Sequence, residues 1–161
     1  MNKESYEFAY DVYDDIDELP EADAQLVKAA RQTTEAAYAP YSSFRVGAVA
    51  RLANGELVTG TNQENAAYPV GICAERVLLG SSAALYPGVP IDTLVVSYHN
   101  LNGESDKPIS PCGMCRQSLV EYQERLKQPI RLILSGMSGK VIVIEKANSL
   151  LPLNFGSMDL K

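Results

Sequence analysis

Three cysteines lie in two short motifs whose spacing suits a metal ion. Cys112 and Cys115 stand three residues apart at the start of a predicted helix, so both sulfur atoms lie on one face and can reach one ion. Cys73 starts a second predicted helix. The unpaired amides of a first helical turn carry partial positive charge, which favours thiolates there. Taken alone, the Cys-x-x-Cys pair also fits a redox dithiol or half of a structural zinc site, so its interpretation depends on Cys73.

The number of candidate ligands predicts an open site. Zinc is usually held by four tetrahedral ligands, and a catalytic site leaves one of the four positions to water. The chain has no fourth cysteine, and its one histidine, His99, lies at the end of a predicted strand, far from both motifs. We therefore expect Cys73, Cys112 and Cys115 to hold a catalytic Zn²⁺ ion with one position left for water.

Glu75 follows Cys73 by two residues and is the candidate general acid and base. A carboxylate at this spacing can reach a water on the metal without binding the metal itself, and it can move protons between that water and a substrate. A glutamate in a first helical turn is also explained by the helix dipole alone. Beside a metal with an open position, proton transfer is the favoured interpretation.

The two motifs together, Cys-Ala-Glu at 73–75 and Pro-Cys-Gly-Met-Cys at 111–115, resemble the signature of zinc-dependent nucleoside and nucleobase deaminases. Longer stretches resemble the small homotetrameric cytidine deaminases; these are residues 38–48, 60–68, 71–76, 111–117 and 150–155. The resemblance covers about Leu26 to Phe155. It implies hydrolysis of cytidine, and of deoxycytidine, to uridine and ammonia in pyrimidine salvage, by a zinc-activated water with Glu75 as the proton shuttle.

The resemblance also implies which residues hold the substrate. Asn62 and Glu64 match the pair that hydrogen-bonds the ribose, and an amide with a carboxylate can both donate to and accept from sugar hydroxyls. Phe44 matches the aromatic side chain that packs against the pyrimidine, and Ala74 would offer backbone groups to the base. From the residues alone, Asn62 and Glu64 are as well explained as loop residues, and Phe44 as a core residue.

Roles are predicted for four further residues, Tyr68 and Phe155 from the same resemblance and Arg76 and Gln117 from the charge of the zinc site. Tyr68 and Phe155 match residues that reach the active site of a neighbouring subunit, which implies a homotetramer with shared sites. Arg76 would donate hydrogen bonds to the ligand sulfur atoms, because a guanidinium offsets the excess negative charge of Zn²⁺ with three thiolates. Gln117 would support Arg76. A plain surface position on the helix is the alternative for Arg76.

The periodicity of apolar residues predicts an α/β fold. Period-two alternation predicts a strand from Tyr6 to Ile16, and Asn54-Gly55 between two strand-like runs predicts a hairpin. The last two strands should be antiparallel, because residues 135–140 between them are too few for a parallel crossover. The expected elements are helices at 21–38, 73–86 and 112–127 and strands at 6–16, 44–52, 56–61, 91–98, 130–134 and 141–144.

These elements form a mixed sheet of about five strands covered by helices, which allows an extra N-terminal strand at one edge. The family resemblance implies the three-layer arrangement of the cytidine deaminases. Residues 1–20, which are acidic and rich in tyrosine, lie outside the resemblance and are interpreted as an extension, with residues 14–18 left in solvent. Residues 21–161 are the expected deaminase domain.

Composition limits the partners. A chain of 161 residues with 46% hydrophobic and 21% charged residues is expected to form one globular domain. Its net charge of −6 and the lack of a basic cluster argue against nucleic acid, so a small nucleoside is the expected substrate. No apolar run approaches the ~20 residues of a membrane span, and no signal-peptide pattern is visible, so we expect no membrane partner and a cytoplasmic location.

Other functions compete with this interpretation. A redox protein built on Cys112 and Cys115 leaves the motif at Cys73 unexplained, and a structural zinc module lacks a fourth ligand. A deaminase of nucleic acid or of nucleotides is disfavoured by the acidic charge. A deaminase of an antibiotic nucleoside shares the zinc motif, but the ribose motif at Asn62 and Glu64 favours cytidine.

Overall fold

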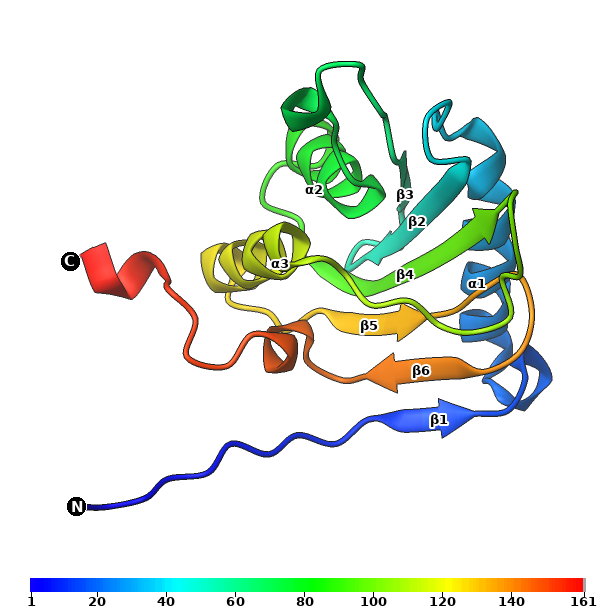
Figure 1. Cartoon of the computed structure of the whole chain (residues 1–161). Coiled ribbons are helices and arrows are strands. Elements are labelled where there is room, and N and C mark those ends of the chain that lie inside the picture. Colours follow the sequence, from blue (N-terminus) through cyan, green and yellow to red (C-terminus); the bar gives the residue numbers. More distant parts are fainter. Residues whose placement is uncertain (161) are drawn as a thin grey trace.

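The computed structural model describes residues 1–160 and contains a six-stranded sheet in the order β1-β6-β5-β4-β2-β3 (Figure 1). The strands are β1 (Asp11–Tyr13), β2 (Phe44–Leu52), β3 (Leu57–Thr61), β4 (Ile91–Asn100), β5 (Arg131–Leu134) and β6 (Val141–Ile144). The α-helices of this range are α1 (Glu21–Thr33), α2 (Ala74–Leu85) and α3 (Gly113–Leu126). Its short 3₁₀ turns are η1 (Ile16–Glu18), η2 (Thr34–Ala36), η3 (Tyr68–Val70), η4 (Ala147–Leu150) and η5 (Ser157–Leu160). Within residues 1–160, no helix has both the length and the apolar character that a membrane span requires.

The strand pairings follow the lengths of the connections. β2 and β3 form the antiparallel hairpin expected at Asn54-Gly55, where Gly55 has a φ of 88° that favours glycine. β4 and β5 are parallel, and α3 lies in the crossover between them. β5 and β6 are antiparallel, which confirms the expectation from their short connection. The predicted α/β class with a mixed sheet is therefore confirmed.

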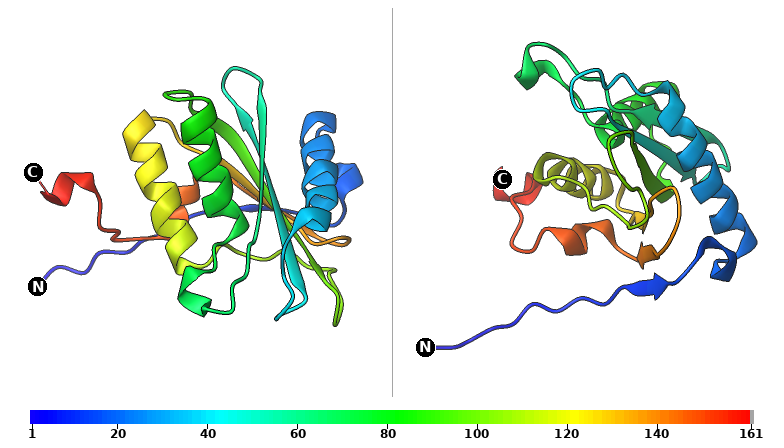
Figure 2. Two further views of the ribbon diagram at one scale, coloured as in Figure 1. Left: turned by 90° about the horizontal axis from the view of Figure 1, so that it is seen from above. Right: turned by 45° about the vertical axis from the view of Figure 1, so that its right-hand side comes forward.

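Helices cover both faces of the sheet and make three layers (Figure 2). α1 lies on one face, and α2 and α3 lie on the other. Residues of β4 alternate between two cores: Leu94 and Val96 pack on the side of α2 and α3, whereas Val95 packs with Val27 of α1. The two helices that carry the cysteine motifs therefore share one face of the sheet.

The backbone at the start of α2 packs directly against the backbone of β3 at Gly60. A Cβ atom at this position would lie 2.4 Å from the carbonyl oxygen of Ala74 and 2.6 Å from the amide nitrogen of Leu78, so a larger residue would displace the helix. This contact fixes the depth at which α2 begins. It therefore also fixes the position of Cys73, the N-cap residue of α2.

The N-terminal segment differs from the expected strand of residues 6–16. Only Asp11–Tyr13 pair with the sheet, antiparallel to β6 and at its edge. The edge position is confirmed, but the predicted length is wrong: β6 is four residues long, so residues 1–10 have no strand to join and run out as an exposed segment. Ile16 was expected in solvent with its acidic neighbours, but it is buried in the core that includes α1.

The first 20 residues are strongly acidic. Residues 1–20 contain seven acidic side chains and one lysine, so their net charge of −6 equals that of the whole chain. The rings of Tyr6, Phe8 and Tyr10 follow one another at centroid distances of 6.4 and 6.0 Å. The Tyr6 hydroxyl donates to the carbonyl oxygen of Ser149 at 3.0 Å, so the segment before β1 is anchored to η4.

Candidate active site

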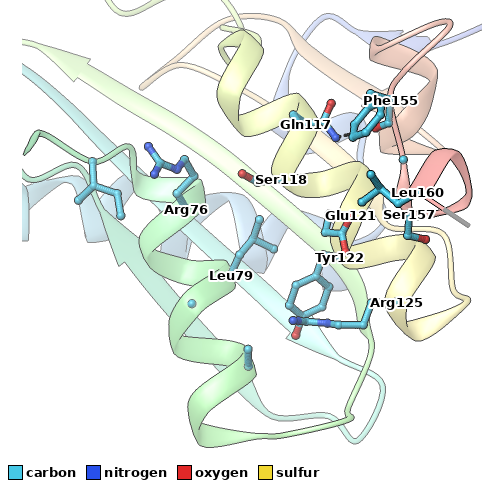
Figure 3. A pocket seen from close by; sticks show the side chains of 14 residues that line it. Arg76, Leu79, Gln117, Ser118, Glu121, Tyr122, Arg125, Phe155, Ser157 and Leu160 are labelled. Atoms are coloured by element: carbon cyan, nitrogen blue, oxygen red, sulfur yellow. Dashed lines mark hydrogen bonds between the residues drawn. The ribbon is translucent and has the colours of Figure 1, made fainter. Parts of the chain in front are cut away.

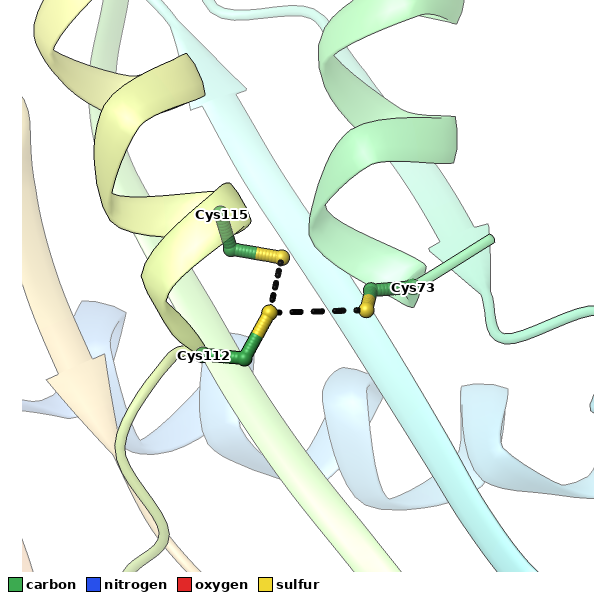
Figure 4. A group of neighbouring side chains, drawn as sticks. All are labelled: Cys73, Cys112 and Cys115. Carbon is green, nitrogen blue, oxygen red and sulfur yellow. Dashed lines mark hydrogen bonds between the residues drawn. The ribbon is translucent and has the colours of Figure 1, made fainter. Parts of the chain in front are cut away.

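The N-termini of α2 and α3 bring the three cysteines together (Figure 4). Cys73 is the N-cap residue of α2 and Cys112 that of α3, both with extended backbone, and Cys115 lies in the first turn of α3. Neither cap residue makes a side-chain hydrogen bond to its helix, so the first-turn amides keep their partial positive charge. Two positive helix ends thus meet at one sulfur cluster.

The separations of the sulfur atoms match those of a tetrahedral zinc site. Sγ of Cys112 lies 3.7 Å from Sγ of Cys73 and 3.5 Å from Sγ of Cys115, and all three atoms are within 4.8 Å of one another. Zn–S bonds of ~2.3 Å at tetrahedral angles put two ligand sulfur atoms about 3.8 Å apart. A disulfide would need about 2.05 Å, and all three cysteines are free thiols. The spacing of the cluster therefore fits zinc, and its three sulfur atoms offer three of the four ligands that zinc prefers.

Hydrogen bonding inside the cluster favours a thiolate. The thiol of Cys115 is the main cause that lowers the pKa of Cys73 to about 6, with smaller contributions from Cys112 and Arg76 against the opposing effect of burial. The same interaction, together with burial, raises the pKa of Cys115. Hydrogen bonds from the neighbouring thiols thus stabilise one thiolate in the cluster, and a divalent cation would deprotonate the remaining thiols.

Glu75 lies in the first turn of α2 and is 5% exposed. Burial is the largest influence on its carboxyl group and raises its pKa. The carboxylate in turn contributes to the raised pKa of Cys115, so it lies close to the sulfur cluster. A carboxyl group that takes up a proton readily suits proton transfer in both directions.

A cavity of about 380 Å³ lies between the loops before β2 and after β3. Glu64 lines it and accepts hydrogen bonds from the Tyr41 amide at 2.9 Å, the Ser42 amide at 3.2 Å and the Ser42 hydroxyl. The bond from the Ser42 hydroxyl is the main cause that lowers the pKa of Glu64. Tyr68 forms another part of the wall, packs edge-on against Tyr41 and is 76% exposed. The cavity therefore combines a fixed carboxylate with two aromatic rings.

Asn62 and Phe44 lie together at the start of β2. Asn62 accepts from the Val46 amide through Oδ1 at 2.7 Å and donates from Nδ2 to the Phe44 carbonyl at 2.9 Å. The ring of Phe44 stacks on the buried ring of Tyr98, with centroids 4.8 Å apart and planes at 14°. Both side chains are therefore held in place, and the Asn62 amide keeps a further donor and a further acceptor position.

Arg76, Gln117 and Phe155 line a separate groove of about 580 Å³ between α2, α3 and the C-terminal tail (Figure 3). None of the three cysteines lines this groove, so it is separate from the sulfur cluster. Gln117 donates from Nε2 to the Phe155 carbonyl at 2.8 Å, so its amide holds the tail, whereas we expected it to support Arg76. The charge of Arg76 acts on the cluster and helps to lower the pKa of Cys73.

A mixed sheet that presents three converging cysteines and a buried glutamate at two helix N-termini defines a zinc-dependent hydrolase. The family described as the cytidine and deoxycytidylate deaminase zinc-binding region matches residues 20–127, which include the three cysteines and Glu75. The match covers more than half of the chain. The chain belongs to this family, and its cofactor is zinc.

Relatives and solved structures agree with the family. The chain is 33% identical over 135 residues to a cytidine deaminase of Halalkalibacterium halodurans, which covers 84% of this chain and 95% of that protein. It is 30% identical over 140 residues to a blasticidin-S deaminase of Bacillus cereus, covering 85% of this chain and 94% of that protein. The crystal structure of a cytidine deaminase from Burkholderia pseudomallei superposes with a TM-score of 0.72 at 37% identity, covering 85% of this chain and 100% of that chain.

Three residues that contact the site or its supports were not predicted from the sequence. Ser42 holds Glu64, Tyr98 stacks on Phe44, and Arg116 ties the start of α3 to η4. Ser42 and Arg116 lie inside the motif stretches, so their positions were a usable signal. The contact of Tyr98 with Phe44 arises from the pairing of β2 with β4, and a local sequence pattern does not predict which strands pair.

Proposed function

We propose that the protein hydrolyses cytidine and deoxycytidine to uridine or deoxyuridine and ammonia, with Cys73, Cys112 and Cys115 as zinc ligands and Glu75 as the proton carrier. The sulfur cluster carries this proposal, because its spacing suits zinc and a buried glutamate lies beside it. The family match supports the same chemistry. A free nucleoside also suits the small cavity around Glu64.

Glu75 performs the proton transfers of this reaction. When bound, zinc supplies an open ligand position for water and lowers the pKa of that water. Glu75 takes a proton as the water attacks C4 of the pyrimidine, and it gives this proton to ring nitrogen N3. It then moves the remaining proton from the new C4 hydroxyl to the amino group, which leaves as ammonia. The raised pKa of Glu75 suits a group that must hold a proton between these steps.

The substrate is oriented by residues that are already fixed. The Asn62 amide and the Glu64 carboxylate bind ribose hydroxyls with the hydrogen-bonding positions that their protein contacts leave free. The ring of Phe44, held by Tyr98, packs against the pyrimidine. Ala74 offers backbone groups to the base at the start of α2.

Neighbouring subunits complete the site in a homotetramer. Tyr68 and Phe155 support this proposal, because their large rings are 76% and 60% exposed in the single chain. A deaminase needs a shaped pocket that excludes bulk water, and another subunit supplies the missing wall. Sedimentation and activity across a dilution series test the assembly. A fully active monomer, or an unchanged Michaelis constant in Phe155→Ala, would contradict it.

The proposed setting is pyrimidine salvage in the cytoplasm. Zinc binding requires that all three cysteines remain reduced, and they are free thiols here. A reducing compartment keeps them in that state.

Ammonia release from cytidine by the zinc-loaded protein is the test of the activity. Cytidine and deoxycytidine should both be deaminated, and removal of zinc by a chelator should abolish the reaction until zinc is restored. Blasticidin S belongs in the same assay, because the chain also resembles a blasticidin-S deaminase. Turnover of blasticidin S in preference to cytidine would replace the proposed substrate and leave the zinc chemistry unchanged.

A further inference from the structure

Arg116 follows Cys115 on α3, but its side chain reaches back past the start of the helix. Its Nε donates to the carbonyl oxygen of Pro111 at 2.8 Å, and its Nη1 donates to the carbonyl oxygen of Leu150 at 3.0 Å. The guanidinium is part-buried. One planar group therefore bridges the residue that precedes Cys112 and the last residue of η4.

Cys112 is the zinc ligand that has the least support from its surroundings. Cys115 is fully buried inside α3, and Cys73 begins a helix that Gly60 holds against β3. Cys112 is exposed, and the twelve residues from Leu101 to Cys112 contain no helix or strand. The orientation of the Pro111–Cys112 peptide therefore decides where the Cys112 sulfur lies.

Arg116 is suited to fix that peptide. Pro111 is buried, and its carbonyl oxygen lies outside the helical hydrogen bonds of α3, so it needs a donor from elsewhere. Arg116 supplies the donor, and its own amide donates to the carbonyl of Cys112 at 3.0 Å. The bond to Leu150 gives the guanidinium a second anchor in η4, whose Ser149 carbonyl accepts from Tyr6.

The contribution of Arg116 is geometric rather than electrostatic. The arginine whose charge lowers the pKa of Cys73 is Arg76, and Arg116 is not among the groups that shift the pKa of Cys73 or of Cys115. Both guanidinium bonds go to neutral carbonyl oxygens in different directions. A lysine would keep the charge, but its single ammonium group cannot reproduce a rigid two-way fork.

We propose that Arg116 is a positioning residue of the zinc site: it fixes the Pro111–Cys112 peptide, so that the Cys112 sulfur meets those of Cys73 and Cys115 at ligand spacing. This inference rests on the ligand set proposed above. Its test therefore measures the metal site itself and needs no turnover.

The experiment compares Arg116→Lys and Arg116→Met with the parent protein. Loss of an outer-shell partner typically weakens metal affinity about 10–100-fold. In competition with a chelator, both variants should therefore show a zinc affinity about 10–100-fold lower than that of the parent. Co²⁺ in place of zinc reports the ligand geometry, and the thiolate-to-Co²⁺ absorption bands should weaken or shift in both variants. Arg116→Lys retains the charge and carries the test if Arg116→Met does not fold.

Arg31→Lys is the matched control. Arg31 is also part-buried and donates from Nε to a carbonyl, that of Gly136, at 2.9 Å, but it belongs to α1 on the opposite face of the sheet. This control should lower thermal stability and leave zinc affinity and the Co²⁺ spectrum unchanged. Parent-like zinc affinity and spectrum in Arg116→Lys, or equal losses in Arg31→Lys, would overturn the proposal. Cys112→Ala separates the two ideas: full zinc retention in that variant would refute the ligand set, whereas zinc loss in that variant together with parent-like zinc affinity in Arg116→Lys would refute the role of Arg116 alone.

Discussion

Replacing Glu75 with glutamine removes the proposed proton carrier and keeps nearly the same side-chain shape. Glu75 is almost fully buried, and it is the one carboxyl group that shifts the pKa values of Cys73 and Cys115, so within residues 1–160 no second carboxylate acts on the cluster. General acid–base catalysis typically contributes about 10²–10⁴-fold. Because the proposed mechanism has Glu75 move two protons in each turnover, the loss in kcat should lie toward the upper end, a rise in barrier of about 4–5.5 kcal/mol.

The assay is ammonia release from cytidine at saturating concentration, with zinc content measured on the same sample. Glu75→Gln should keep one zinc per chain, because glutamine leaves the three sulfur atoms untouched. Glu21→Gln makes the same chemical change at the start of α1, on the other face of the sheet, and should leave kcat unaltered. A Glu75→Gln enzyme that retains zinc and turns over within tenfold of the parent would refute the proton-carrier role.

Four further changes test other parts of the site. Replacing each proposed ligand cysteine with alanine should abolish stoichiometric zinc by elemental analysis, and full retention in any one variant would exclude that residue. Gly60→Ala should cost roughly 1–3 kcal/mol of unfolding free energy and loosen zinc, since its Cβ would meet the Ala74 carbonyl; an unchanged melting temperature would contradict this contact. Arg76→Gln should weaken zinc retention or turnover without changing the Michaelis constant, and parent-like values for both would make Arg76 a surface residue. The pKa of Glu64 is lowered, mainly by the hydrogen bond from the Ser42 hydroxyl. The ionised carboxylate and its hydrogen bonds should therefore be fully present at pH values above the ordinary glutamate pKa and be lost as the pH falls through the lowered pKa. The Michaelis constant should rise in acid in the parent and not in Glu64→Gln; equal pH profiles would remove Glu64 from ribose binding.

The helices and most strands were predictable from local pattern. The strand predicted at 44–52 has the observed bounds, and the helix predicted at 73–86 is observed as Ala74–Leu85. Each of these segments has an apolar face of the matching period that is buried in the fold. The N-terminal strand was predicted too long, because its alternating pattern is real but its neighbour β6 offers four residues. The length of an edge strand is limited by the length of the strand that it pairs with, and the sequence of the edge strand does not contain that information.

The sequence by itself determined which residues are the candidates for the chemistry. Thiolate ligands, a carboxylate two positions later and the helix starts that favour them are local features, so Cys73, Glu75, Cys112 and Cys115 could be named from residue type and spacing. Tertiary structure decided how these residues and their supports meet. The sulfur spacing of 3.5–3.7 Å, the stacking of Phe44 on Tyr98 and the partner of Gln117 depend on elements far apart in the chain. Such contacts follow from the packing of α2, α3 and the tail on one sheet, which is a property of the whole fold and of no single segment.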